Sequence, residues 1–291
     1  MKKLVAIVFG VILGLTMTYD ASASHLAGGS IRYDYVGPTP GSTTLWRYKI
    51  TVSMMRDCRG ITFNCGTTPS QLYGVCTSSG AQIGPILLTA VPYVPKPGER
   101  TNARGAKDVS DICSGTQSRC QGNNQALSGY EVYFFEATVD LPRCNSWRLT
   151  YQTCTCCRNP IQNFTGGGNV ALETFINTSW SPRGNPGGAP ANSAPQFADE
   201  AKPFPSACVG QNVFYGIGTY DADGDSLRFE ATCPWATNTS VGRPNLAAMN
   251  PRNGATCARA IPGVFIDPAT GLISFRAQTQ GAWVVAFYVS E

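Results

Sequence analysis

Alternation of apolar and polar residues is the dominant pattern along this chain, and it predicts short β-strands. Between residues 46 and 54 every second side chain is large and apolar, and the residues between them are basic or hydroxylated. This period of two places the apolar side chains on one face of a strand. No long segment has the 3.6-residue period of a helix. Patterns of this kind predict strands at 31–35, 46–54, 130–139, 146–153, 170–177, 212–218, 226–231, 263–266, 271–276 and 282–290.

The last of these predicted strands is apolar on both faces. Trp283, Val285, Phe287 and Val289 alternate with Val284, Ala286 and Tyr288. A strand of this composition needs cover on both sides, so we expect a core strand rather than a flexible tail. The sequence ends two residues after Val289, and we interpret the chain as a fragment of a longer protein.

Turn-forming stretches divide the predicted strands into two groups. Residues 24–180 are predicted to form an N-terminal disulfide-rich β-sandwich, and residues 196–291 a second, truncated one. Residues 181–195 are rich in glycine and proline and are predicted to be a linker. Within the first group, residues 96–129 form a long polar loop that contains Cys113 and Cys120. A loop of this length is normally functional or disordered, and a disulfide is the usual way to hold it. The predicted fold class is therefore all-β, with two disulfide-stapled sandwich modules.

The N-terminus has the features of a secretory signal peptide. Lys2 and Lys3 precede an apolar run at residues 4–15, and small residues lead up to Ala23. We expect cleavage after Ala23. The apolar run is shorter than the roughly 20 residues that a bilayer core requires, and no later stretch is long enough to cross a membrane. The mature protein is therefore predicted to be secreted or displayed at the cell surface, with no membrane span.

The cysteines support an oxidising compartment. Their number is even, as expected if all form disulfides in a secreted chain. A zinc site is disfavoured, because the pair Cys154 and Cys157 has no second CxxC and no histidines at short spacing. We expect a local bridge between Cys208 and Cys233, with Cys257 either free or bonded to the first module. The candidate disulfide residues are Cys58, Cys65, Cys76, Cys113, Cys120, Cys144, Cys154, Cys156, Cys157, Cys208, Cys233 and Cys257.

Charge and histidine content exclude several classes of function. The formal net charge of +4 falls to +3 when residues 1–23 are removed, and charged residues make up only 14% of the chain. Nucleic-acid binding is therefore not expected. His25 is the single histidine, which excludes serine and cysteine triads and histidine-rich zinc sites.

Three aspartates at alternate positions form the candidate metal site. Asp221, Asp223 and Asp225 surround Gly224, and Ca²⁺ prefers oxygen ligands of this kind. The alternative is a polar Asp-Gly turn between strands. An EF-hand is excluded, because Pro234 lies near the position where a glutamate ligand is required. If calcium binds, we expect a carbonyl or another acidic residue such as Glu200 to complete the site.

Several motifs together resemble a known group of proteins. Their residues are SHLAGGSI at 24–31, RDC at 56–58, CNSW at 144–147, CCRN at 156–159, CVGQ at 208–211 and DADGDSL at 221–227. This combination resembles large secreted Bacteroidetes surface proteins that are associated with gliding motility. The second module also resembles cadherin-like and PKD-like domains, through NSAPQF at 192–197 and the DADGDSL motif.

The resemblance implies tandem immunoglobulin-like or cadherin-like modules, export through the type IX secretion system and a role in cell adhesion. We therefore expect a non-enzymatic protein whose partners are extracellular proteins, glycan surfaces or copies of itself. One alternative is a subunit of an extracellular filament or sheath, with strands donated between subunits. A weaker alternative is a secreted hydrolase or carbohydrate-binding module. Catalysis by paired carboxylates is disfavoured, because the acidic residues cluster on one short turn.

Overall fold

The structure is a computed structural model of the 291-residue chain, and strands dominate it. It describes residues 25–60, 71–102, 105–110, 112–113, 116–122, 127, 129–152, 161–165, 169–179, 191–197, 207–237 and 246–291. The described part contains one short 3-10 helix, η1 (Arg119–Gln121), and no α-helix. The predicted all-β fold class is confirmed. None of its described segments forms a helix long and apolar enough to cross a membrane. The predicted signal peptide lies outside the described residues.

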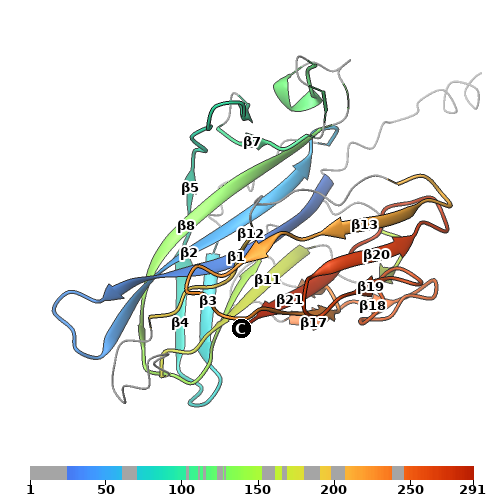
Figure 1. The fold of residues 1–291 in the computed structure, drawn as a ribbon. Helices are drawn as coiled ribbons and strands as arrows, with labels where there is room; N and C mark the ends of the chain where they lie inside the picture. The colour runs from blue at the N-terminus through green and yellow to red at the C-terminus, as the bar shows by residue number, and fades with distance from the viewer. Residues whose placement is uncertain are drawn as a thin grey trace, which may run out of the picture.

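Three long antiparallel strands, β1, β2 and β8, make up most of the first sheet and cross the molecule diagonally (Figure 1). Its order is β1-β2-β8-β7-β6, and β5 also pairs with β8. The short strand β5 pairs with the middle of β8, and β7 pairs with its first residues. The bounds are β1 (His25–Pro38), β2 (Leu45–Asp57), β5 (Thr89–Val91), β6 (Arg100–Thr101), β7 (Lys107–Asp108) and β8 (Tyr130–Pro142).

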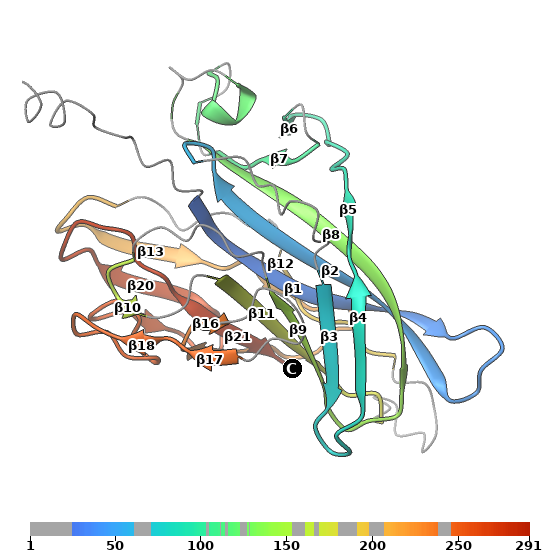
Figure 2. The same cartoon turned by 180° about the vertical axis from the view of Figure 1, so that it is seen from behind.

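A second six-stranded sheet packs against the first, and it includes strands from both predicted modules (Figure 2). Its order is β17-β16-β11-β9-β3-β4. The strands β16 and β17 come from the predicted second module and continue this sheet past β11. The bounds are β3 (Gln71–Cys76), β4 (Gln82–Leu87), β9 (Trp147–Gln152), β11 (Asn169–Ile176), β16 (Trp235–Thr237) and β17 (Leu246–Ala248).

The core between the two large sheets confirms the alternation seen in the sequence. The β2 side chains from Trp46 to Met54 at every second position are buried, and they pack with Trp147, Leu149 and Tyr151 of β9. Gly29 of β1 allows the close approach of the neighbouring strand. A Cβ at this position would lie 2.6 Å from the Ser53 carbonyl oxygen, so a larger residue would push β1 away from β2.

The remaining strands form small sheets around a second core. A three-stranded sheet has the order β13-β20-β19, and its inner face packs with β15 and β21 around Phe229 and Ile273. All strand pairs between named elements are antiparallel. The bounds are β10 (Phe164–Thr165), β12 (Gln196–Phe197), β13 (Asn212–Gly216), β14 (Thr219–Tyr220), β15 (Arg228–Thr232), β18 (Asn250–Pro251), β19 (Phe265–Ile266), β20 (Leu272–Arg276) and β21 (Ala286–Ser290).

The end of the predicted linker is attached to the first sheet. The amide of Ala194 donates to the Tyr33 carbonyl at 2.8 Å, and the Tyr35 amide donates to the Ser193 hydroxyl at 3.1 Å. Ala194 is buried in the main core. Residues 191–195 therefore follow the outer edge of β1, and residues 181–190 lie outside the described part. The two halves of the chain are joined by this contact and by the shared second sheet.

Three disulfides connect described cysteines: Cys58–Cys120, Cys76–Cys144 and Cys233–Cys257. The first ties the end of β2 to the long loop, as expected for Cys120. The predicted Cys208–Cys233 bridge is wrong. Cys233 is buried beside Ala236 and Met249, where the chain after β18 brings Cys257, whereas Cys208 is exposed at a turn before β13.

Two cysteines differ from the expectation that all are paired. Cys113 and Cys208 carry free, exposed thiols in the described structure. The backbone amide of Cys208 is held by the Gln211 side chain at 2.9 Å, which keeps residue 208 on the surface side of this turn. The other four predicted disulfide residues, Cys65, Cys154, Cys156 and Cys157, lie outside the described residues.

Candidate functional site

Acidic side chains gather where the end of the predicted linker meets both halves of the chain. Asp221 directly follows β14, and Glu291 directly follows β21. Asn192 lies on the outer edge of β1 and donates from its side chain to Glu291 Oε2. The amide of Ser193 donates to Asp223 Oδ2 at 2.8 Å. We call this group, Asn192, Asp221, Asp223, Asp225 and Glu291, the acidic junction.

The aspartate turn has its own internal order. Asp221 Oδ1 accepts hydrogen bonds from the amides of Asp223 at 2.8 Å and Asp225 at 3.2 Å. A carboxylate that caps the following amides in this way holds a tight turn, with Gly224 at a φ of 89°. The described residues 221–225 therefore form a polar turn. Asp223 and Asp225 are exposed on this turn, whereas the second oxygen of Asp221 is buried.

Burial and neighbouring charge change the proton affinity of this cluster. Partial burial of the Glu291 carboxyl raises its pKa from the ordinary 4.5 to about 7, and the charges of Asp221 and Asp225 add to this effect. A proton on Glu291 would also donate to the Asp221 carboxyl, which further favours the neutral form. The hydrogen bond from Asn192 acts in the opposite direction. Beneath the cluster, burial followed by the charge of Glu291 raises the pKa of the Tyr33 hydroxyl.

Two oxygen atoms in the acidic junction fit a cation. Asp221 Oδ2 and Asn192 Oδ1 are both buried, and neither accepts a hydrogen bond from the described protein. Buried acceptors without partners are unfavourable, and a hard cation such as Ca²⁺ would satisfy both. The donor set of carboxylates and an amide carbonyl is the set that calcium prefers. The residues present therefore fit calcium in their chemistry.

The described carboxylates are not already arranged as a closed cage. Among the described residues, only Cys58, Cys120 and Glu131 bring three possible ligand atoms within 4.8 Å of one another, and both sulfur atoms belong to a disulfide. Cation binding at the acidic junction would thus require its carboxylates to move closer together. The predicted ligand Glu200 lies outside the described residues. Glu291 and Asn192 take its place as candidates, and neither was singled out from the sequence.

A large groove opens next to the acidic junction. Its volume is about 2050 Å³, and it lies between β1 and β11 on one side and the C-terminal segment 277–291 on the other. Asn192, Asp225 and Glu291 are part of its lining, so the acidic junction borders it. Pockets for small ligands are typically about 300–1,000 Å³. The groove is thus large enough for an extended segment of a macromolecule.

The wall of the groove is held by a polar and aromatic cluster that joins the two halves. Tyr288 of β21 donates to Glu173 of β11 and accepts from the Trp235 indole at 2.9 Å. Arg148 Nε donates to Glu173 at 2.6 Å, and Arg148 Cζ lies over the Trp235 ring, 5.6 Å from its centre. Burial first, and then the bond to Glu173, raises the pKa of Tyr288 to about 12. These contacts fix β21 beside β11 although the two strands belong to different sheets.

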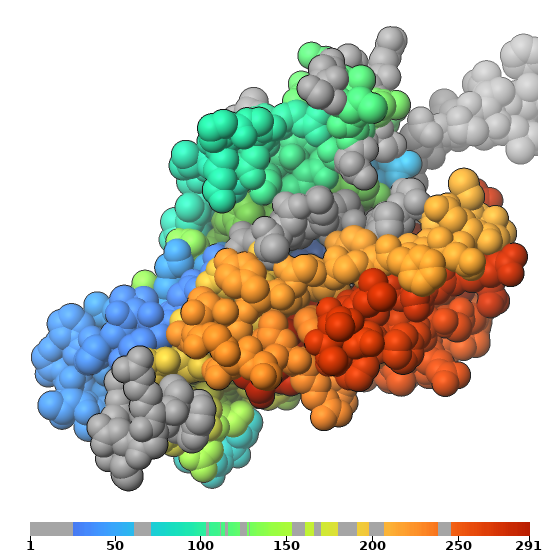
Figure 3. All heavy atoms as spheres, in the orientation of Figure 1, coloured from blue at the N-terminus to red at the C-terminus, as the bar shows by residue number. Residues whose placement is uncertain are grey.

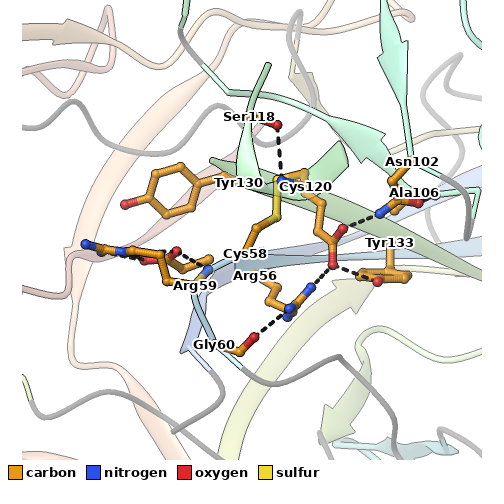
Figure 4. A network of polar contacts seen from close by, with 12 residues as sticks. Arg56, Cys58, Arg59, Gly60, Asn102, Ala106, Ser118, Cys120, Tyr130 and Tyr133 are labelled. Atoms are coloured by element: carbon orange, nitrogen blue, oxygen red, sulfur yellow. Dashed lines mark hydrogen bonds and ion pairs between the residues drawn. A yellow bond between two sulfur atoms is a disulfide. The ribbon is translucent and has the colours of Figure 1, made fainter. Parts of the chain in front are cut away.

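A second polar network lies at the C-terminal end of β2, and it includes Arg56 and Cys58 of the RDC motif. Arg56 forms an ion pair with Glu131 of β8, and both side chains are buried, at 6% and 1% exposure. Glu131 also accepts from Asn102 and from the Tyr133 hydroxyl, while Arg56 donates to the Gly60 carbonyl (Figure 4). Every charged group in this network has partners, which is the condition for burying charge.

The disulfide and the long loop close this network. Cys58 lies two residues after Arg56 and forms a disulfide with Cys120. The Cys120 amide donates a hydrogen bond to the Ser118 hydroxyl (Figure 4). On the same loop the buried Asp108 accepts from Ser110 and Ser118. Because the Cys58 and Cys120 sulfur atoms are bonded to each other, the network is not available as a metal site. We assign it a structural role.

Sequence reasoning missed most partners in these three clusters. Glu131 pairs with Arg56, Glu291 with Asn192 and Glu173 with Tyr288, across 75, 99 and 115 residues of sequence. A glutamate at an inward position of a strand, as at residue 131, was the available signal for the buried pair. No motif or spacing in the sequence indicates that Asn192 lies close to Asp223.

Comparisons with known proteins give no relatives for this chain. No family model matches it, and neither the curated proteins nor the solved structures contain a match. The resemblance to gliding-associated surface proteins therefore rests on the sequence motifs alone.

Proposed function

We propose that this protein is a non-enzymatic adhesion protein of the extracellular cell surface, of the gliding-motility-associated type. The observation that carries the proposal is the groove of about 2050 Å³ between the two halves of the chain. Its described lining is more apolar than polar, and it includes Phe175, Phe197 and Tyr215. Such a surface suits the binding of a macromolecular segment better than the turnover of a small substrate.

Disulfides and the predicted signal peptide support the extracellular location. Disulfides persist in oxidising compartments, and three are present among the described cysteines. The Cys58–Cys120 disulfide ties a long loop to the end of β2, which suits a protein exposed to mechanical load and proteases. Export through the type IX system is part of the proposal through the motif resemblance.

Calcium at the acidic junction is the second part of this proposal. Asp221, Asp223 and Asp225 would hold the ion, with Glu291 and Asn192 as further ligands. The ion would supply positive charge that offsets carboxylate repulsion. Because these residues come from the linker end, the turn after β14 and the end of β21, binding would lock the two halves beside the groove.

The experiment has two readouts. An antibody against the chain should label intact, unpermeabilised cells that produce it. Beads coated with the purified, oxidised chain should be retained under flow on surfaces coated with extracellular polysaccharide or protein, whereas beads coated with reduced and unfolded chain should not. The proposal would be contradicted if the antibody labels cells only after permeabilisation. It would also be contradicted if both kinds of bead are lost equally from every surface.

A filament or sheath subunit is the second candidate, and the outer edge of β1 favours it. Ala194 and Ser193 cover β1 only near Tyr33 and Tyr35, and in the described chain the rest of this 14-residue strand pairs only with β2. A long open edge can accept a strand from another subunit. Ile31 has the same orientation as Tyr33, so Ile31→Pro should remove an outward amide. Concentration-dependent polymers that this substitution abolishes would favour the filament, and a monomer at all concentrations would exclude it.

A further inference from the structure

The outer face of the three-stranded sheet β13-β20-β19 carries an exposed aromatic row. Phe214 of β13 and Phe265 of β19 both lie directly opposite Ser274 of the central strand β20. Their side chains are 72% and 58% exposed, which is unusual for phenylalanine in a strand. On the opposite face Ile273 is buried in the second core, and Val213 is also buried. Alternation thus places both rings outward, on either side of a small hydroxylated residue.

The residue pairs on the two sides of these rings differ in polarity. Asn212 and Arg276 are paired on one side, and Gly216 and Leu272 are paired on the other. Arg276 Nε donates to the Gly210 carbonyl at 3.1 Å, which fixes the guanidinium at the border of the face. Leu272 is 41% exposed. The face therefore has a hydrogen-bonding border, a central aromatic row and an apolar border.

From these observations we infer that this face binds a linear polysaccharide, whose sugar rings stack on Phe214 and Phe265. A pyranose ring has an apolar face of C–H groups and an edge of hydroxyls. The C–H face matches an exposed phenyl ring, and the hydroxyl edge matches Ser274, Asn212 and Arg276. The inference rests on the proposed adhesion function, to which it adds the class of ligand.

Spacing and area both favour a chain-like ligand. Directly opposite residues on neighbouring strands are about 5 Å apart, so the two phenyl side chains start about 10 Å apart with only Ser274 between them. A linear glycan that crosses the strands can therefore contact both rings. The face formed by the five-residue strands β13 and β20 and the two-residue strand β19 covers on the order of 200 Å². A stable protein interface needs about 800 Å² on each partner, so this face alone is too small for a second copy of the chain.

The surface in this region is open to such a ligand. In Figure 3 the orange and red atoms of the C-terminal half form a broad outer surface on the right-hand side of the molecule, where β13 and β20 lie in Figure 1. The groove lies between the two halves of the chain, and neither Phe214 nor Phe265 lines it. The aromatic row is therefore a second binding surface.

The test is affinity electrophoresis of the intact, oxidised chain in native gels that contain hydroxyethyl cellulose, polygalacturonate or no polysaccharide, all with chelator. We expect at least one polysaccharide to retard the wild-type chain. Phe214→Ala and Phe265→Ala should each weaken binding about tenfold, as loss of one stacked ring implies. Leu87→Ala is the matched control, since Leu87 on β4 is also 58% exposed. It should bind like wild type.

The two polysaccharides separate the sources of affinity. If Arg276 contacts sugar carboxylates, Arg276→Gln should weaken binding to polygalacturonate only, and if it contacts hydroxyls, binding to both should weaken. The inference is overturned if neither polysaccharide retards the wild-type chain or if both phenylalanine variants bind normally. It is also overturned if these variants change only the oligomeric state in light scattering. Bead adhesion that persists in the double phenylalanine variant would leave the proposed function standing without this ligand class.

Discussion

Buried charge is the residue-scale feature on which the stability of the first sheet most depends. Glu131→Gln should leave the Arg56 guanidinium buried without its counter-charge. Breaking a buried pair in this way costs about 3–5 kcal/mol. Urea unfolding of the oxidised protein measures the loss. Asp140→Asn is the matched control, because Asp140 pairs with Arg47 with both side chains about one-third exposed, and surface pairs contribute about 0–1 kcal/mol. Equal effects of the two substitutions would show that the Arg56–Glu131 pair is not buried.

Glu291 gives the acidic junction a defined pH dependence. Its pKa is raised from 4.5 to about 7 in the folded protein, so the neutral carboxyl is the favoured form. Its contribution to stability is complete below pH 4.5 and is lost as the pH rises to about 7. In the presence of chelator, the melting temperature of wild type should therefore fall more over this range than that of Glu291→Gln. Parallel curves would contradict the assignment.

Calcium binding should have the opposite dependence, because the ion binds the ionised carboxylates and competes with protons. Isothermal titration should show apparent affinity that increases from pH 5 to pH 8. At a hundredfold excess over the dissociation constant, the ion should stabilise the folded chain by about 2.7 kcal/mol. Asp221→Asn should remove the effect, and Asp267→Asn, in the turn between β19 and β20, should retain it. A melting temperature that is independent of calcium and chelator would remove the metal from the proposal.

At the scale of elements, the disulfides determine which loops stay attached to which strands. Cys233–Cys257 closes a loop with a sequence separation of 24 and joins the end of β15 to the segment after β18. Replacing both cysteines with serine should destabilise the chain by about 2–4 kcal/mol. Cys208→Ser should change stability by less than about 0.5 kcal/mol, since its thiol is exposed and free. Thermal melting measures both, and a non-reduced peptide map that links Cys208 to Cys233 would contradict this connectivity.

Strands with clear alternation could be predicted from the sequence, and the way in which they combine could not. All ten predicted segments contain strands, and β1 and β2 are longer than predicted because their ends alternate less clearly. The strands β3 and β4 were missed. Gly74 interrupts the apolar pattern of β3, and it is required because a Cβ there would lie 2.5 Å from Ile83. The predicted last strand begins only at Ala286, because residues 282–284 bond to Gln162 and Asn163 instead.

The candidate sites depended even more on long-range contacts. Spacing within the DADGDSL motif was enough to predict the turn at Asp221. Asn192 and Glu291 approach that turn because of the way in which β1 and β21 pack. The local sequence does not indicate this approach. The same reason explains the wrong disulfide. Cys208 and Cys233 are near in sequence, but β13 and β15 belong to different sheets, so their cysteines do not meet.

At the scale of the whole molecule, the two predicted modules share a sheet, a linker contact and a groove. Pairing of β16 with β11 and the contacts of Tyr288 with Glu173 join the halves on one side. The acidic junction joins them on the other. A ligand in the groove would therefore contact both halves at once, and calcium at its border would hold the two halves together. This coupling would link adhesion to the calcium content of the surroundings.

The most direct test of this account fills the groove and measures adhesion. Gly28 lines the groove, and a Cβ there would meet only Met55 at 3.7 Å, so Gly28→Trp should fold and project into the groove. Val94→Trp, at a site that is 81% exposed and outside the groove, is the matched control. Beads that carry the Gly28→Trp chain should detach under flow at which beads with the wild-type or Val94→Trp chain are retained. Equal retention of all three, with unchanged melting temperatures, would show that the groove does not carry the adhesive function.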